Sequence, residues 1–214
     1  LYLGLEHYLT RQKDVAESLA VITKDGSERI MEYAFKYAIE NGRKKVTACH
    51  KANILKFTSG LFLDTAREVA ERYPEIEFDE MIVDATCMHM VMNPQQFDVV
   101  VTTNMFGDIL SDLTAGLVGG LGLIPGANIG VDAALFEAVH GSAPDIAGKN
   151  IANPTAVIMA GVMMLHHLGE TDAANRIKAA VEKVVEDAES VTPDLNPNSI
   201  AGTIEMGEAI IAEL

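Results

Sequence analysis

Three consecutive valines form the centre of segment 97–103, and a helical pattern over about 107–117 follows them directly. A continuous run of β-branched residues is typical of a strand that is buried on both faces of a sheet. Such strands occur where helices cover both sides of the sheet, which favours an α/β architecture.

Helix and strand signals alternate through the rest of the first half. Ser27 is expected to be the N-cap of a helix that stops at Asn41-Gly42. The segments that follow are expected as strand, helix and strand: 45–49, 60–73 and 76–84. This alternation supports the same fold class.

A change in composition marks a junction between two domains. Residues 116–130 contain six glycines and Pro125, which predicts a loop or chain crossing rather than a regular element. We place the junction near Gly119-Gly120, so that the domains cover 1–119 and 120–214.

The second domain is expected to contain a strand at 134–140, a long loop at 140–154 and three helices. Asn153 and Pro154 suit the N-cap and first position of a helix that closes at Gly169. The other two helices are expected at roughly 171–189 and 199–213.

The charge balance excludes several classes of partner. Sixteen Lys and Arg against 31 Asp and Glu give a net charge of −15, whereas proteins that bind polyanions carry the opposite sign. We therefore expect no nucleic-acid and no membrane partner, and no apolar run is long enough to span a bilayer. Two cysteines make no disulfide framework, which favours a cytoplasmic location, or the mitochondrial matrix in a eukaryote.

Two carboxylates one helical turn apart follow the valine strand. Asp108 and Asp112 are four residues apart, so both project from one face of a helix. A hard divalent cation between them, Mg²⁺ or Mn²⁺, relieves their repulsion. The alternatives are an ordinary solvated helix face or acidic residues that complement a helix dipole.

Two further polar residues stand where strand patterns end. Asp84 ends the pattern at 76–84, where a carboxylate is either a ligand at the sheet edge or a turn residue. Lys51 follows the strand at 45–49, and an amine among apolar neighbours suits proton transfer. A surface lysine after a strand is the alternative.

The loop 140–154 is the third candidate. Its small residues allow a ligand to approach backbone N–H groups, and Asp145 can accept hydrogen bonds from a ribose diol. A carboxylate there repels a 2′-phosphate, which favours NAD over NADP. No G-x-G-x-x-G follows a strand, so a classical Rossmann site is not supported. As a pattern alone, the loop is equally an ordinary connection.

Positive charge is scarce in the middle of the chain. Lys149 is the only Lys or Arg between Arg72 and Arg176, a span with thirteen Asp and Glu residues. An anionic substrate bound there needs positive charge from a metal ion and from residues elsewhere.

Together these clusters resemble the decarboxylating dehydrogenases that act on isocitrate and 3-isopropylmalate. Six matching segments occur in the family's order and cover essentially the whole chain: 2–7, 50–56, 79–84, 104–112, 126–130 and 140–154. The first and fifth are more similar to the NAD-dependent isocitrate branch. The resemblance implies the family's two-domain α/β fold, with a smaller dimerising domain at 1–119 and the C-terminal part of the nucleotide-binding domain at 120–214.

The resemblance also implies an active site shared between the subunits of a dimer or higher even oligomer. One subunit supplies Lys51 and Asp84, and the other supplies Tyr2, Asp108 and Asp112. The three aspartates would hold Mg²⁺ or Mn²⁺. Lys51 would help to remove the proton of the substrate hydroxyl, and Tyr2 would protonate the enolate after loss of CO₂.

The implied small-molecule contacts lie in two segments. Asn53 would contact the substrate, and the loop would bind NAD through six residues: His140, Gly141, Ala143, Asp145, Ile146 and Asn153. In NADP-dependent relatives Lys and Tyr tend to occupy the positions of Asp145 and Ile146, so their replacement implies NAD.

The implied reaction is the oxidative decarboxylation of isocitrate to 2-oxoglutarate. The family's segment upstream of Tyr2, with its substrate-binding arginines, is not in these 214 residues, so we expect them to be inactive alone. Relatives that use 3-isopropylmalate, homoisocitrate or tartrate are the alternatives within this class of enzyme. A non-catalytic regulatory subunit is the alternative from another class.

Overall fold

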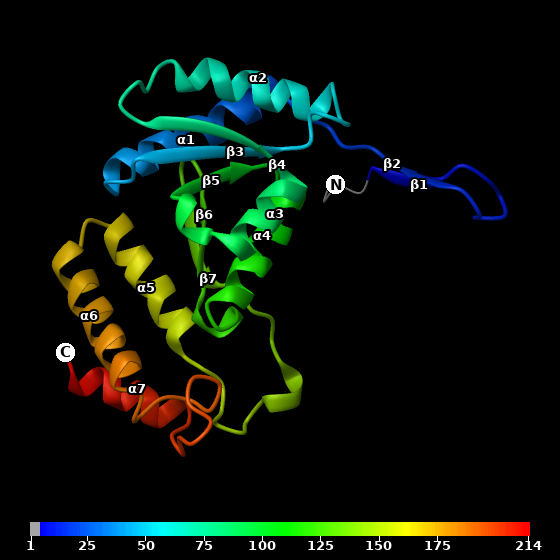
Figure 1. Cartoon of the computed structure of the whole chain (residues 1–214). Coiled ribbons are helices and arrows are strands. Elements are labelled where there is room, and N and C mark those ends of the chain that lie inside the picture. The colour runs from blue at the N-terminus through cyan, green and yellow to red at the C-terminus, as the bar shows by residue number, and fades with distance from the viewer. Residues whose placement is uncertain (1–4) are drawn as a thin grey trace. The chain divides into compact units, whose positions relative to one another are not determined.

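The computed structural model describes residues 5–214, which divide between Leu113 and Thr114 into two compact units (Figure 1). Both units combine helices and strands, and the α/β fold class is confirmed. The expected junction at 119–120 falls shortly after this division. In the described part of the chain, no helix is both long and apolar enough to cross a membrane.

A three-stranded parallel sheet forms the middle layer of the first unit. β3 (Lys45–His50) lies at its centre and pairs with β4 (Glu77–Ile82) and β5 (Val99–Thr102). Alternate residues of a strand face opposite sides: Val46 and Ala48 belong to one core cluster and Cys49 to another. The sheet is therefore buried on both faces, as the valine run predicts.

Helices supply the two outer layers of this unit. α1 (Lys24–Glu40) and α2 (Thr58–Ala70) contribute Phe35 and Phe62 to the first cluster. α3 (Val83–Met92) and α4 (Asn104–Leu117) contribute Met90 and Leu110 to the second. The expected strands and helices are present, although a short helix at α3 was not expected.

Two expected boundaries in this unit are wrong. α1 begins one turn before Ser27, because Thr23 is the N-cap and its hydroxyl accepts from the Gly26 N–H at 3.1 Å. Ser27 is buried inside the helix and donates to the Thr23 carbonyl. The strand pattern at 76–84 ends at Ile82, and Asp84 lies in the first turn of α3.

The first unit also contains a hairpin that the sequence did not suggest. β1 (Glu6–Tyr8) and β2 (Ala16–Ser18) pair antiparallel with each other, and all six strand residues are exposed. Figure 1 shows this hairpin as a narrow arm at the start of the described chain.

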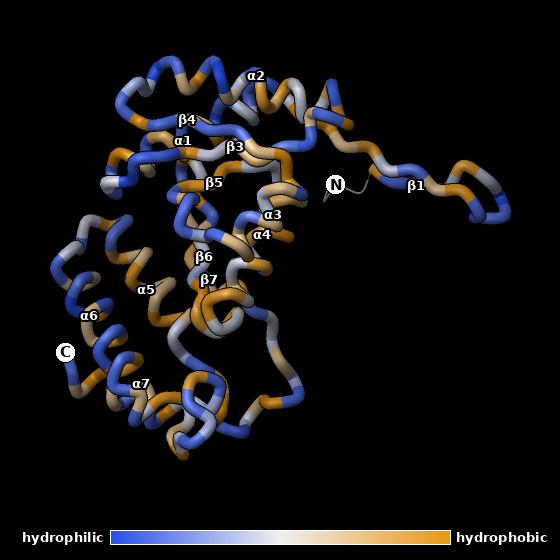
Figure 2. The backbone as a smooth tube through the Cα atoms, in the orientation of Figure 1, coloured by the Kyte–Doolittle hydropathy of each residue, from blue (hydrophilic) through white to orange (hydrophobic). Residues whose placement is uncertain are grey.

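The second unit is built around three helices and a strand pair. α5 (Thr155–His167) packs against the antiparallel strands β6 (Pro125–Ile129) and β7 (Ala134–Ala138). α6 (Thr171–Asp187) packs on α5 and α7 (Thr203–Ala212) on α6. Hydrophilic and hydrophobic segments alternate within the turns of α6, as expected of a helix with one buried face (Figure 2).

The prediction that 116–130 is a loop is wrong over its second half, where β6 runs. Pro125 is tolerated because it is the first residue of the strand. Gly126 is needed for close packing, since a Cβ there would lie 3.1 Å from the Val139 side chain. Pro125 and Gly126 therefore belong to a packed strand rather than to a loop.

We expect Phe35 to be a major contributor to the stability of the first unit. Its side chain is fully buried and stacks on Tyr73 with a centroid separation of 4.9 Å. Phe35→Ala should lower the free energy of unfolding by about 3–5 kcal/mol, measured by urea unfolding. Phe57→Ala is the matched control, because Phe57 is 92% exposed. Equal effects of the two substitutions would contradict the assignment of this core.

Candidate functional site

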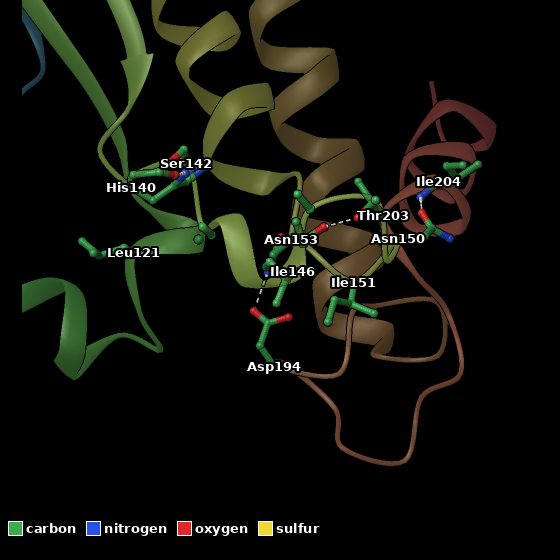
Figure 3. A pocket seen from close by; sticks show the side chains of 16 residues that line it. Leu121, His140, Ser142, Ile146, Asn150, Ile151, Asn153, Asp194, Thr203 and Ile204 are labelled. Carbon is green, nitrogen blue, oxygen red and sulfur yellow. Dashed lines mark hydrogen bonds between the residues drawn. The ribbon is translucent and has the colours of Figure 1, made fainter.

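A pocket of about 860 Å³ opens in the second unit, beside the loop 140–154 and the first turn of α7 (Figure 3). This volume lies within the range of small-molecule sites. Five of the six predicted nucleotide-binding residues line the pocket: His140, Gly141, Ala143, Ile146 and Asn153. The sixth, Asp145, lies in the short 3₁₀ helix η3 (Pro144–Ile146) but is not among the lining residues.

The lining of this pocket is mostly apolar and carries no fixed positive charge. Among the described residues that line it there is no Lys or Arg, and Asp194 is the one carboxylate. A ligand that carries one more phosphate group would bring that phosphate near the Asp194 carboxylate. No lysine or arginine of the lining would offset the repulsion. The pocket therefore suits a ligand with a large apolar or aromatic part and few charges.

Hydrogen bonds on both sides fix the side chain of Asn153. Its Nδ2 donates to Asp194 Oδ2 at 2.9 Å (Figure 3). Its Oδ1 accepts from the Thr155 N–H at 2.9 Å. Pro154 rather than Asn153 occupies the N-cap position of α5, so that prediction is off by one residue. Asn153 nevertheless accepts a hydrogen bond from the first turn, which is what an N-cap side chain does.

Sequence reasoning missed Asp194, Asn150 and the first turn of α7 as parts of this pocket. Asp194 lies 41 residues from its partner Asn153. No local pattern links these segments, because only the packing of α5, α6 and α7 brings them together. The loop that begins at His140 was singled out from the sequence and forms one wall of the pocket. No sequence pattern indicated the residues of the opposite wall.

The first unit brings Lys51 and Asp84 together. Lys51 follows β3 and Asp84 follows the neighbouring strand β4, and the ends of parallel strands meet at one edge of the sheet. The Lys51 ammonium donates to the Asp84 carboxylate, which lowers the pKa of that carboxyl. The lysine side chain is 25% exposed and the aspartate 69%, so Asp84 can be reached from outside the chain.

Asp108 and Asp112 lie one turn apart in α4, as the spacing predicts. Within the described part of a single chain, however, no three His, Cys, Asp or Glu residues lie close enough to hold a metal ion. Asp84 is therefore not joined to the α4 pair by the fold of one chain. Asn53 is exposed in the turn after Lys51, and Tyr2 lies outside the described residues.

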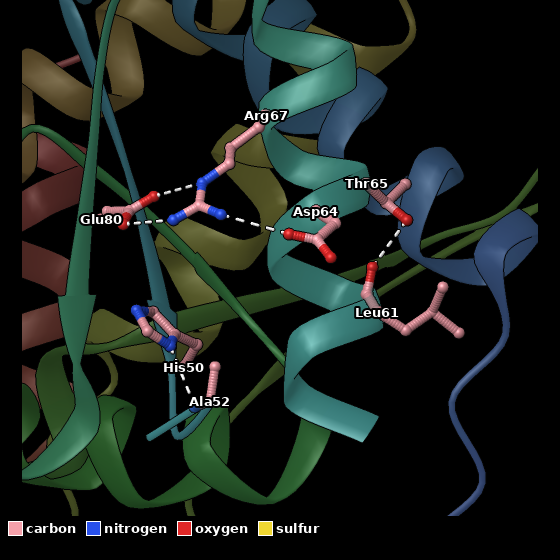
Figure 4. A network of polar contacts seen from close by, with 7 residues as sticks. All are labelled: His50, Ala52, Leu61, Asp64, Thr65, Arg67 and Glu80. Atoms are coloured by element: carbon pink, nitrogen blue, oxygen red, sulfur yellow. Dashed lines mark hydrogen bonds and ion pairs between the residues drawn. The ribbon is translucent and has the colours of Figure 1, made fainter. Parts of the chain in front are cut away.

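A buried histidine shapes the turn that carries Lys51. His50 Nδ1 accepts from the Ala52 N–H at 3.0 Å (Figure 4). The ring also faces a charged pair in which Arg67 donates to both oxygens of Glu80, at 2.8 and 2.6 Å. Burial lowers the pKa of His50, so the neutral ring that can accept this bond is favoured. The sequence analysis did not single out His50.

Comparison with known proteins gives consistent matches. The family model described as isocitrate/isopropylmalate dehydrogenase matches residues 1–210. The chain is 57% identical over 198 residues to 3-isopropylmalate dehydrogenase of Archaeoglobus fulgidus, covering 92% of this chain and 60% of that protein. It is 54% identical over 214 residues to catalytic subunit 5 of the mitochondrial NAD isocitrate dehydrogenase of Arabidopsis thaliana, covering all of this chain and 56% of that protein.

A solved structure gives the same result. Isocitrate dehydrogenase from Methylococcus capsulatus superposes with a TM-score of 0.96 at 66% identity, covering all of this chain and 63% of that one. The chain thus spans little more than half of the length of the curated relatives it matches.

We expect His50 to make stability fall on acidification. Burial holds the pKa of His50 in the folded protein below its ordinary value, so the unfolded chain takes up a proton first as the pH drops. The free energy of unfolding should therefore decrease below about pH 6.5, measured by urea unfolding across that range. His50→Asn should remove this part of the pH dependence, because an amide oxygen can still accept from Ala52 without titrating.

His166→Asn is the control, since His166 is exposed on α5. It should leave the pH dependence of the wild-type chain unchanged. A His50→Asn variant with the full wild-type pH dependence would show that His50 is not responsible.

Proposed function

Since the chain belongs to the isocitrate/isopropylmalate dehydrogenase family, we propose that it takes part in the NAD-dependent oxidative decarboxylation of isocitrate. The observation that carries this proposal is the pocket of the second unit, whose wall contains five of the six residues predicted to bind the nucleotide. The Methylococcus and Arabidopsis relatives favour isocitrate as the substrate. 3-Isopropylmalate is the second candidate, because the relative from Archaeoglobus is named for it.

The proposed nucleotide is NAD rather than NADP. The pocket is large enough for an adenosine group, and its small residues let a ligand reach the backbone. Asp194 in the wall and Asp145 in the adjoining 3₁₀ helix both disfavour a 2′-phosphate, and no lining cation offsets them. Bound NAD supplies the acceptor for the hydride that leaves the substrate.

The proposed metal ligands are Asp84, Asp108 and Asp112. Carboxylate oxygens are the donors that Mg²⁺ and Mn²⁺ prefer, and Asp84 is exposed at the sheet edge. A single chain does not bring these three residues together. They can hold one cation when a second copy of the chain supplies Asp108 and Asp112. A bound cation supplies Lewis acidity that makes a coordinated hydroxyl more acidic.

Exposed apolar residues support a second copy as the partner. Met105 and Ile109 lie on α4 at the same one-turn spacing as the acidic pair, and are 46% and 52% exposed. The β1–β2 hairpin and its flanking residues expose further apolar side chains: Leu5, Leu9, Val15 and Leu19. Such surfaces are typical of protein–protein interfaces. A homodimer that packs through α4 would place its acidic pair beside the partner's sheet edge.

The roles of the first-unit side chains follow from this arrangement. Asp84 would hold the cation in place of its contact with Lys51. Lys51 would then release its ammonium proton to solvent, and its neutral amine would take the proton of the substrate hydroxyl. Asn53, two residues further on, contacts the substrate. The His50–Ala52 hydrogen bond holds the turn that carries Lys51 during these steps.

We expect calorimetric titration to show NAD binding at least tenfold more tightly than NADP, because an unpaired phosphate beside carboxylates is costly. Asp145→Lys should narrow this preference by supplying the missing cation. Asp132→Lys is the control, as it adds the same charge at an exposed turn outside the pocket.

Equal affinity for the two nucleotides would contradict the NAD assignment. Titration of isocitrate and of 3-isopropylmalate, each in the presence of Mn²⁺, separates the two candidate substrates. Tighter binding of 3-isopropylmalate would replace isocitrate in the proposal.

We expect a shared metal site to be recovered by mixing two defective variants. Asp84→Asn and Asp108→Asn should each abolish Mn²⁺ binding in calorimetry. In a hybrid dimer, one site carries both substitutions and the other carries neither. Unfolding and refolding an equal mixture should therefore restore about a quarter of the wild-type sites, because half of the dimers are hybrids with one intact site.

Asp172→Asn, an exposed substitution in the first turn of α6, is the control and should leave Mn²⁺ binding intact. Variants that bind Mn²⁺ normally would contradict the metal assignment and favour the regulatory-subunit alternative. Loss of binding without recovery on mixing would contradict the shared site.

A further inference from the structure

Helix α7 forms one wall of the nucleotide pocket, yet its N-cap residue offers no side chain to its first turn. Its N-cap is Gly202, which has no side chain that can accept from the first turn. Two N–H groups of the first turn instead donate hydrogen bonds to one residue of the loop (Figure 3). The Asn150 carbonyl accepts from the Thr203 N–H at 3.1 Å, and Asn150 Oδ1 accepts from the Ile204 N–H at 3.0 Å.

The same asparagine is held from its other side. Its Nδ2 donates to Glu205 Oε2 at 2.9 Å, and the Gly202 N–H donates to the same oxygen at 2.9 Å. The pKa of Glu205 is lowered first by its own backbone N–H and then by the Asn150 amide and the Gly202 N–H, which favours the ionised form. The Thr203 hydroxyl donates to the carbonyl of Ala152, two residues after Asn150. Loop and helix are thus joined by a reciprocal set of bonds.

The backbones approach each other too closely for any side chain at position 202. A Cβ there would lie 2.0 Å from the Asn150 carbonyl oxygen. Asn150 itself has a φ of 56°, a left-handed conformation that asparagine tolerates better than most residues. Both residue types therefore follow from the geometry of this junction.

The junction lies in the wall of the pocket. Asn150, Ile151, Ala152 and Asn153 line the pocket from the loop, and Thr203 and Ile204 line it from α7. These two segments are not neighbours in the sequence, since Asn150 and Ile204 are 54 residues apart. Their relative placement at the junction depends on the bonds of Asn150.

We propose that Asn150 is a positioning residue for the nucleotide: it caps α7 from the loop and so holds the two walls of the pocket at the spacing that NAD requires. This inference rests on the proposed NAD-binding function. α7 is anchored separately, because Met206 and Ile210 are buried in the core cluster shared with α6. Removal of the cap therefore loosens the pocket wall without releasing the helix.

The test combines affinity with amide exchange in the full chain. Asn150→Ala should raise the Kd for NAD roughly five- to tenfold, measured by calorimetry. The Ile204 amide should exchange with deuterium faster, while amides in the middle of α6 keep their wild-type rates. Asn128→Ala is the matched control, because Asn128 also donates to a glutamate, Glu137 at 2.9 Å, outside this pocket.

A double substitution that exchanges the donor and the acceptor of the Asn150–Glu205 hydrogen bond separates positioning from a general loss of structure. Asn150→Asp alone sets two carboxylates against each other and should weaken NAD binding. Adding Glu205→Gln restores a donor opposite the new acceptor and should recover part of the affinity. Unchanged Kd and exchange rates in Asn150→Ala, or no recovery in the double variant, would overturn the proposal.

Failure of the proposed function gives a different result. A wild-type chain that does not bind NAD would contradict the nucleotide assignment and, with it, a role of Asn150 toward NAD. In that case faster Ile204 exchange in Asn150→Ala would still support the cap, and unchanged exchange would overturn the cap as well.

Discussion

The parallel pairing of β3 with its two neighbours is the constraint on which the first unit depends. Parallel strands end at the same edge, so the residues that follow β3 and β4 meet there without any sequence proximity. Lys51 and Asp84 are 33 residues apart and still form an ion pair. The same pairing requires burial of both sheet faces, which explains why the valines of β5 are flanked by two helical layers.

Strands, helices and the loop at 140–154 could be predicted where the signal is local. The valine run, the stop at Asn41-Gly42 and the small residues of 140–154 all have physical meanings within a few positions. The interpretation failed where a residue had two possible roles. Ser27 has the chemistry of an N-cap, but Thr23 takes that role one turn earlier. Pro125 can end an element, but here it begins a strand.

The missed parts of the candidate site share one cause. Asp194 accepts a hydrogen bond from a residue 41 positions away, and the first turn of α7 donates one to a residue 54 positions away. Only helix packing creates these contacts. A glycine at a helix N-cap gave no hint that an asparagine from a distant loop supplies the cap. Likewise, sequence spacing pairs Asp108 with Asp112 but does not place Asp84. Only the family resemblance implied that Asp84 is separate from this pair, and the fold of one chain does not bring the three together.

The β1–β2 hairpin carries a consequence for how this protein folds. Two short strands that bury no residue between them gain little free energy from their own hydrogen bonds. In the proposed homodimer, contact with the partner's surface would stabilise this arm, so its order would depend on the protein concentration. Dilution would then loosen the arm first, while the three-stranded sheet, whose core is internal to one chain, would persist.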